Sequence, residues 1–273
     1  MKPDEMPLGR WSDVPRAYDP ALLYPVSRSR NRRELDHALD PWPWYGEDRW
    51  QAWELSWLRA DGRPRVAVGE FRVPVNSPYL IESKSLKLYL NSLNNERFES
   101  RDAFRNTLVA DLSAAAGAAV DVSLFSVDAA WTAMARPPGA SLIDDAEAAG
   151  QPQESPLERL RGPGDETVSE TLCSHLLRSL CPVTGQPDWG TLLVAYEGPR
   201  ISQGALLDYI LGLRETAEFH EQCVERIFHD LHRRLAPTTL RVAAWYTRRG
   251  GLDINPWRST HPGEAPSLRL RRQ

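Results

Sequence analysis

The sequence predicts an α+β protein made of two tandem modules, each an antiparallel sheet with helices packed on one face. Segments with alternating apolar and β-branched residues flank pairs of segments whose apolar residues recur at helical spacing. The order strand, helix, helix, strand occurs twice, which is typical of duplicated α+β units. The chain has 273 residues, enough for two domains of roughly 100–150 residues each.

The first module is predicted over residues 46–135. Residues 1–45 are rich in Pro, Arg and Asp, and we expect them to form an arm that lies over a domain. WELSWL and RVAVGEFRVPV then alternate around a turn at Asp61-Gly62, which predicts two strands. Helices are expected at about 83–94 and 101–116, where Phe104, Leu108 and Leu112 recur every four residues, and AVDVSLFSV follows as a strand.

The second module is predicted over residues 167–273. Residues 136–166 are dense in Pro, Gly and acids without periodicity, so they are interpreted as a linker. We expect a helix at about 167–180, the turn-rich loop LCPVTGQPDWGT, the strand TLLVAYEG, helices at about 203–215 and 219–234, and the strand LRVAAWYTR.

Composition excludes several classes of function. The net charge of -4 and the pI near 5.9 argue against direct binding of nucleic acid. No stretch approaches the roughly 18 apolar residues of a membrane span, and the start lacks a signal-peptide core, so we expect a cytoplasmic protein without a membrane partner. Three cysteines without CxxC spacing do not make a disulfide framework, so at least one is a candidate working thiol.

Cys181 and Asp188 are the first candidates for chemistry, because they share one turn-rich loop. Pro182 disfavours helix at Cys181, which places this cysteine at the end of the expected helix. The helix dipole raises a thiol pKa there, so activation has to come from a general base, and Asp188 is the nearest one. The alternative is that Asp188 caps a turn and Cys181 is a small buried apolar residue.

Four separated motifs resemble one enzyme family: IESKSLKLYLNS at 81–92, CPVTGQPDWG at 181–190, FHEQCVERIF at 219–228 and WYTRRGGLDINPW at 245–257. In this order they resemble the NADPH-dependent 7-cyano-7-deazaguanine reductases, the nitrile reductases of queuosine biosynthesis, in their long two-module form. The resemblance runs from about residue 15 to residue 273. It implies two tunnelling-fold modules in one chain, a homodimer, and a small deazapurine substrate.

The resemblance also implies a mechanism and a set of contacts. The nitrile is reduced to an aminomethyl group with two NADPH, Cys181 forms a covalent thioimide, Asp188 is the proton donor, and no metal takes part. Substrate contacts are implied at Ile81, Glu82, Ser83, Phe219, His220 and Glu221. Cofactor contacts are implied at Ser83, Lys84, Arg249 and Gly250.

The residue types suit these tasks. A helix start with Ser83 and Lys84 favours phosphate, and an arginine pairs bidentately with phosphate and so selects NADPH over NADH. The Glu221 carboxylate is able to accept two parallel N–H groups of a purine-like base. No GxGxxG fingerprint follows a strand, so an ordinary dinucleotide-binding domain is not expected. Taken alone, the motif at 81–92 is better explained as an amphipathic helix, and Glu221 as a first-turn acid favoured by the helix dipole.

Two alternative functions remain open at this point. A zinc-dependent hydrolase like the GTP cyclohydrolases would need a cluster of Cys and His ligands, and the available side chains show no strong zinc spacing: Cys173, His175, Cys181, His220 and Cys223. A non-catalytic purine-binding protein would use Glu221 alone and leave Cys181 inert.

Overall fold

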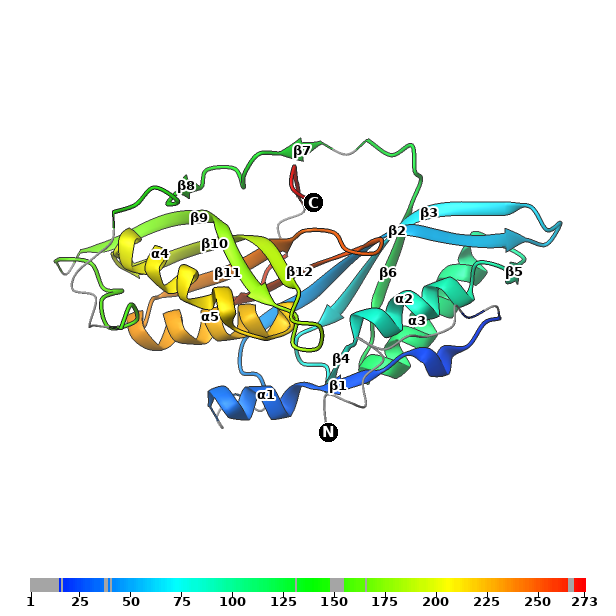
Figure 1. The fold of residues 1–273 in the computed structure, drawn as a ribbon, viewed down its shortest axis with the longest axis horizontal. Helices are drawn as coiled ribbons and strands as arrows, with labels where there is room; N and C mark the ends of the chain where they lie inside the picture. The colour runs from blue at the N-terminus through cyan, green and yellow to red at the C-terminus, as the bar shows by residue number, and fades with distance from the viewer. Residues whose placement is uncertain are drawn as a thin grey trace. The chain divides into compact units, whose positions relative to one another are not determined.

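The computed structural model describes residues 15, 17–36, 39, 41–130, 132–147, 155–164, 166–264 and 268–273 (Figure 1). Contacts divide the chain into two units. Unit 1 comprises the described residues of 1–43, 48–130 and 248–254, and unit 2 comprises those of 44–47, 131–247 and 255–273. Within the described residues, no helix is long and apolar enough to cross a membrane.

The sheet of unit 1 has the strand order β6-β3-β2, with β12 next to β2. Its strands are β2 (Tyr45–Arg59), β3 (Pro64–Pro74), β6 (Asp121–Phe125) and β12 (Leu252–Ser259), and both β2 and β12 continue into unit 2. Gly62 takes a positive φ of 83° in the turn between β2 and β3, which glycine adopts without steric cost. The predicted hairpin around Asp61-Gly62 and the predicted strand at β6 are confirmed.

Two helices supply the apolar layer of unit 1. α2 (Ser83–Ser92) and α3 (Arg101–Ala116) confirm the two helices predicted there. α3 begins after the Ser100 side chain, which accepts the N–H of Ala103, and ends at Gly117 with φ 68°. The predicted four-residue spacing is also confirmed, because Phe104, Leu108 and Leu112 are each at most 1% exposed and lie in one core cluster.

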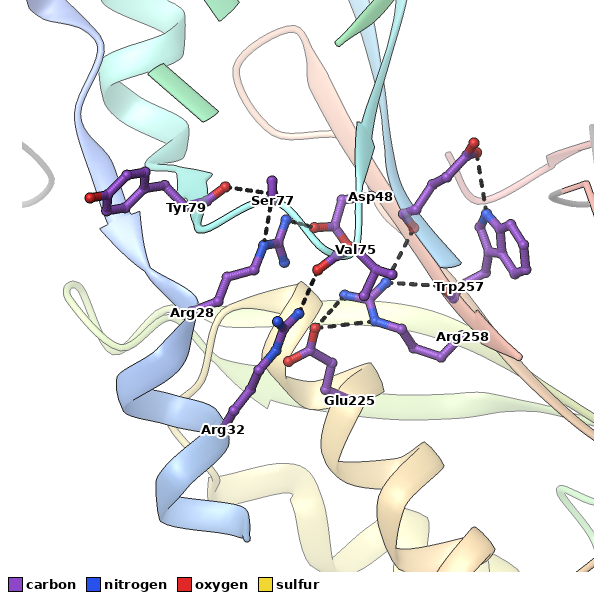
Figure 2. Close-up of polar contacts among 10 residues, drawn as sticks. Arg28, Arg32, Asp48, Val75, Ser77, Tyr79, Glu225, Trp257 and Arg258 are labelled. Atoms are coloured by element: carbon purple, nitrogen blue, oxygen red, sulfur yellow. Dashed lines mark hydrogen bonds and ion pairs between the residues drawn. The ribbon is translucent and has the colours of Figure 1, made fainter. Parts of the chain in front are cut away.

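Shorter elements complete unit 1. They are η2 (Pro20–Leu22), β1 (Pro25–Ser27), α1 (Arg28–Leu35), β4 (Tyr79–Ile81), which pairs with β1, and β5 (Arg97–Phe98), which pairs with β2. The arm before β2 is attached to unit 1 by buried polar contacts (Figure 2): Arg28 pairs with Asp48 and donates to the Ser77 hydroxyl. Arg32 donates to the Val75 carbonyl at 2.7 Å.

The sheet of unit 2 has the order β12-β11-β10-β9-β8. Its strands are β8 (Ser141–Leu142), β9 (Thr167–Leu180), β10 (Pro187–Pro199) and β11 (Thr239–Tyr246), and β7 (Ala133–Met134) pairs separately with β13 (Arg269–Leu270). One face is covered by α4 (Gln203–Gly212) and α5 (His220–Leu235), with the short η4 (Leu213–Glu215) between them (Figure 1). These helices and the strands β10 and β11 agree with the prediction.

The helix predicted at 167–180 is wrong, because these residues form the long strand β9. Leu172, Cys173 and Ser174 are consecutive and all buried, so the strand is covered on both faces there and shows no alternation of apolar and polar residues. Because polar and apolar residues do not alternate there, the Leu-rich sequence leads to the prediction of a helix. Residues 167–180 instead form an antiparallel ladder with β10, in which Thr167 lies opposite Pro199 and Leu180 lies opposite Pro187.

The described segments on both sides of residues 148–154 pack within unit 2. Asp144 accepts hydrogen bonds from the Ser174 hydroxyl at 2.7 Å and from the His175 N–H at 3.1 Å. Ile143 is 1% exposed and Leu160 is fully buried. The stretch interpreted as a linker therefore supplies core residues within its described parts.

Candidate active site

Cys181 lies at the tip of the β9–β10 hairpin. Its N–H donates to the carbonyl of Gln186 at 2.8 Å, and its carbonyl accepts the N–H of Gly185 at 2.9 Å. Gly185 has φ 66°, so the connection is a tight turn of residues 181–186. Cys181 is only 6% exposed. Because β9 is a strand, the helix dipole expected behind this thiol is absent.

Asp188 belongs to β10, close to this turn, and not to the loop as predicted. The ladder places Leu180 opposite Pro187 and Ser179 opposite Asp188, so Cys181 and Asp188 lie at the same end of one hairpin. The Asp188 carboxylate is buried and lies 3.2 Å from Nε2 of His220. The structure therefore brings a predicted substrate contact next to the predicted proton donor.

The ring of His220 is stacked on Tyr246, with ring centroids 3.8 Å apart and planes 8° from parallel. Tyr246 ends β11 and lies opposite Gly190 of β10. A Cβ at Gly190 would lie 3.3 Å from the Tyr246 ring and 3.2 Å from Leu177, so glycine keeps this space open for the tyrosine. The sequence analysis missed Tyr246, because its contact arises only when α5 packs on the sheet.

The chain entering α5 is joined directly to the residue before Cys181. Leu180 donates its N–H to Thr216 at 2.8 Å and accepts the N–H of Glu218 at 3.1 Å. Arg226 of α5 pairs with Glu218 and so ties this segment to the helix. α5 then starts after Phe219, whose N–H donates to the Gln222 side chain at 3.2 Å.

Glu221 lies in the first turn of α5 and is 2% exposed. The same helix is anchored in unit 2 by Arg258 of β12, which donates to one carboxylate oxygen of Glu225 from Nε and from Nη2, at 3.2 and 2.9 Å (Figure 2). Arg258 also donates to the Trp257 carbonyl at 2.8 Å. The position of α5, and with it of His220 and Glu221, is therefore fixed by buried charge as well as by apolar packing.

The other two cysteines are held as thiols. The pKa of Cys223 is raised to about 12 and the pKa of Cys173 to about 11, and burial is the main cause of both shifts. Because the thiolate is the nucleophilic form, neither is reactive at neutral pH. Cys181 therefore remains the candidate nucleophile.

In unit 1, the predicted residues Ile81, Glu82, Ser83 and Lys84 connect β4 to the start of α2. Glu82 is fully buried, and its two carboxylate oxygens accept the N–H groups of Lys84 at 2.8 Å and Ser85 at 2.7 Å. Burial raises the pKa of Glu82, and the two N–H groups and two lysines only partly offset that. Two of the helix N–H groups expected to face an anion are thus occupied by Glu82.

Arg249 and Gly250 lie at the hairpin between β11 and β12, where Gly250 and Gly251 form a two-residue turn. The N–H of Arg249 donates to Leu252 at 2.9 Å, and Gly250 and Gly251 have φ angles of 55° and 75°. Positive φ at both central positions is the pattern of a type I′ hairpin turn. The Gly-Gly pair adopts this geometry without steric strain.

A small pocket of about 40 Å³ opens beside this turn, and Gly250, Gly251, Glu54, Lys87 and Asn91 are among the residues that line it. A Cβ at Gly250 would lie 3.2–3.4 Å from the end of the Lys87 side chain. Lys87 was not predicted as a contact, although its position one helical turn after Lys84 is visible in the sequence.

Within the described part of the chain, no group of three or more His, Cys, Asp or Glu side chains is arranged to hold a metal ion. The residues weighed for a zinc site do not converge there. The predicted residues instead fall into two groups, one in each unit: the hairpin and α5 in unit 2, and the α2 start with the Gly-Gly turn in unit 1.

Two family models match separate parts of the chain. A family described as "Nitrile reductase, 7-cyano-7-deazaguanine-reductase N-term" matches residues 14–124, and one described as "QueF-like protein" matches residues 187–265. A solved structure titled as the archaeosine synthase QueF-Like in the apo form covers 37% of this chain and 99% of its own. At 14% identity and a TM-score of 0.32, it is too dissimilar to establish a common fold.

Three curated relatives are called NADPH-dependent 7-cyano-7-deazaguanine reductase. The protein of Chromohalobacter salexigens is 52% identical over 99% of this chain and 97% of its own length. The relatives of Azoarcus sp. and Chromobacterium violaceum are 50% and 49% identical, over 93% and 94% of this chain and 90% and 92% of their own lengths. Because this similarity extends over nearly full length in every case, the chain belongs to the family of NADPH-dependent 7-cyano-7-deazaguanine reductases.

Proposed function

We propose that this protein reduces the nitrile of 7-cyano-7-deazaguanine to the aminomethyl group, in queuosine biosynthesis, with two NADPH. The observation that carries the proposal is the sequence identity of about 50% to reductases of that name over nearly the full length. It is supported by a buried cysteine at the same end of one hairpin as Asp188, which pairs with His220. The zinc hydrolase and the non-catalytic binder have no comparable support.

The first chemical step belongs to Cys181. Its sulfur adds to the nitrile carbon, the S–H proton passes to Asp188, and Asp188 returns it to the nitrile nitrogen, so the product is a neutral thioimide. A nitrile nitrogen gains negative charge during attack, and a positioned acid stabilises that charge. The 3.2 Å contact with His220 orients the Asp188 carboxylate for this exchange.

Reduction to the amine adds two hydrides and two further protons. NADPH, when bound, supplies each hydride. The protein's part is to keep sulfur attached until the first reduction is complete, to release it as the second begins, and to deliver protons through Asp188. The buried position of Cys181 and Asp188 keeps water from hydrolysing the covalent intermediate.

Substrate recognition is assigned to Phe219, His220 and Glu221, and to Ile81, Glu82 and Ser83. The Glu221 carboxylate accepts the two parallel N–H groups of the deazapurine, and this pairing is strong because the carboxylate is buried. His220, when it donates from Nε2 to Asp188, presents Nδ1 as an acceptor. That nitrogen is buried without a hydrogen-bond partner among the described residues, so it suits an N–H of the base.

The turn of Arg249 and Gly250 fits a dinucleotide phosphate. Glycine at 250 lets the backbone approach a ligand closely, and Lys87 lies against it, so positive charge and open backbone occur together. Ser83 and Lys84 are assigned to the same cofactor, through side chains and the N–H groups that Glu82 leaves open. Lys87 is added to that set.

The finer architecture is also a proposal. Each unit combines strands with two helices of ten or more residues, as expected for a tunnelling-fold module. A homodimer in the cytoplasm follows from the family resemblance. Sedimentation equilibrium of the full chain tests the dimer, and a monomer at all concentrations contradicts it.

The activity is tested by the loss of NADPH absorbance with 7-cyano-7-deazaguanine. The wild type is expected to consume two NADPH per substrate, and Cys181→Ala is expected to consume none. Asp188→Asn is expected to be slower by about 10²-fold or more, because it neither takes nor returns a proton. Cys173→Ala is the control, because its thiol is buried and protonated, and it should keep its activity. Equal rates for Cys181→Ala and Cys173→Ala would refute the proposal.

A further inference from the structure

Trp53 of β2 is attached to the Gly-Gly turn at three points. Its backbone N–H donates to the carbonyl of Gly251 at 2.9 Å. Its indole N–H donates to the Asp253 carboxylate at 2.6 Å, and the guanidinium of Arg248 lies over its ring, 5.3 Å from the centroid. All of these residues belong to unit 1.

Each contact holds a different part of the turn. The backbone bond fixes Gly251, the indole bond fixes the first residues of β12, and the ring holds an exposed arginine in one place. An arginine over an aromatic face gains roughly 0.5–1 kcal/mol at an exposed site and loses part of its conformational freedom. The neighbouring Glu54 also lies against the turn, since a Cβ at Gly251 would come within 2.6 Å of its carboxylate.

We propose that Trp53 is a positioning residue that holds Arg248 and Arg249 in place for the 2′-phosphate of NADPH. The inference deepens the proposed function and rests on it. NADPH and NADH differ only in that phosphate, so the role of Trp53 is to set cofactor preference. A flexible arginine loses binding energy to conformational entropy, whereas an arginine already fixed over a ring does not.

The test compares Trp53→Phe with Trp57→Phe. Phenylalanine at 53 removes the indole donor and shrinks the aromatic face. Trp57 is a matched control in the same strand, because it is 4% exposed and stacks on Phe104 in the core, away from the turn. We expect Trp53→Phe to raise the KM for NADPH by about tenfold with kcat little changed, and to lower the NADPH to NADH ratio of kcat/KM by a similar factor.

A second variant keeps the proposal testable if Trp53→Phe does not fold. Arg248→Gln changes an exposed side chain, and it is expected to raise the KM for NADPH and leave that for NADH unchanged. In the double variant, the effect of Arg248→Gln should be smaller than in the wild type, because the ring no longer holds the arginine. An unchanged KM for NADPH in Arg248→Gln, additive effects in the double variant, or a Trp53→Phe cofactor ratio equal to that of Trp57→Phe would overturn the proposal.

Failure of the proposed function has a different signature. Formation of the Cys181 adduct with 7-cyano-7-deazaguanine needs no NADPH, so its mass is measured without cofactor in every variant. If the adduct forms normally while the cofactor ratio is unchanged in Trp53→Phe, only the role of Trp53 is refuted. If the wild type forms no adduct, the proposed function fails and the inference about Trp53 fails with it.

Discussion

Glu70 shows how a single buried carboxylate ties the stability of unit 1 to pH. It lies 2.6 Å from Nη2 of Arg49 and 2.8 Å from Nε of Arg72, and its side chain is 2% exposed. Burial raises its pKa, but the charges and hydrogen bonds of the two arginines outweigh burial, so the pKa of Glu70 lies below its ordinary value. A lowered folded-state pKa means that this stabilisation is present above the unfolded pKa and is lost as pH falls through the folded pKa.

Glu70→Gln is therefore expected to lower the free energy of unfolding by about 3 kcal/mol near pH 7, because it removes the buried carboxylate charge that pairs with Arg49. The difference from wild type should begin to shrink as the pH falls below the ordinary glutamate pKa of about 4.3, and it should disappear once the pH is below the lowered pKa of the folded carboxyl. Denaturant unfolding at several pH values measures this. Glu34→Gln breaks an exposed pair with Arg30 and should change stability by less than about 0.5 kcal/mol. A Glu70→Gln deficit that stays constant with pH would contradict the account.

Residue-level chemistry was predicted in part. Cys181 and Asp188 could be singled out because turn formers surround them, and the structure places them at one end of a hairpin. Tyr246, which stacks on His220, and Lys87, which lies against Gly250, could not be singled out in the same way, since tertiary packing sets both contacts. The capping role of Glu82 was also missed, although a side-chain acceptor before a helix is a local signal.

At the level of elements, the hairpin of β9 and β10 decides the geometry of the active site. Reading β9 as a helix put Cys181 at a helix end, whereas the strand puts it in a tight turn next to the chain that enters α5. The pattern of polar and apolar residues did not predict β9, because the sheet is covered on both faces there. Helices with one buried stripe, α2, α3 and α5, were predicted correctly because their spacing survives burial on one side.

The Gly-Gly turn offers a test at the same level. Gly251→Ala is expected to destabilise the protein by about 1–2 kcal/mol, because alanine is strained at φ 75° and its Cβ would displace Glu54. Gly212→Ala is the matched control: Gly212 ends α4 with φ -63°, and a Cβ there meets nothing within 4 Å. It should stabilise by about 0.5–1 kcal/mol. Thermal unfolding that shows the same sign for both variants would rule out this explanation.

At the level of the whole molecule, the α+β class and the repeated use of strands and paired helices were visible in the sequence. The exact partition of the chain was not, because β2 and β12 each continue from one unit into the other and a single-sequence pattern has no signal for that. Four short motifs were enough to predict the family. Relatives with about 50% sequence identity over nearly the full length confirm it. The four motifs are more informative than the pattern of polar and apolar residues, because the chemistry of a site constrains which residue stands at each position and not only its polarity.

The central claim is that Cys181 forms a covalent bond with the nitrile, and mass spectrometry of the protein incubated with 7-cyano-7-deazaguanine in the absence of NADPH tests it most directly. The account predicts a gain equal to the mass of one substrate molecule, located on the peptide that contains Cys181 and absent in Cys181→Ala. No gain in mass, or a gain located on Cys173 or Cys223, would contradict it.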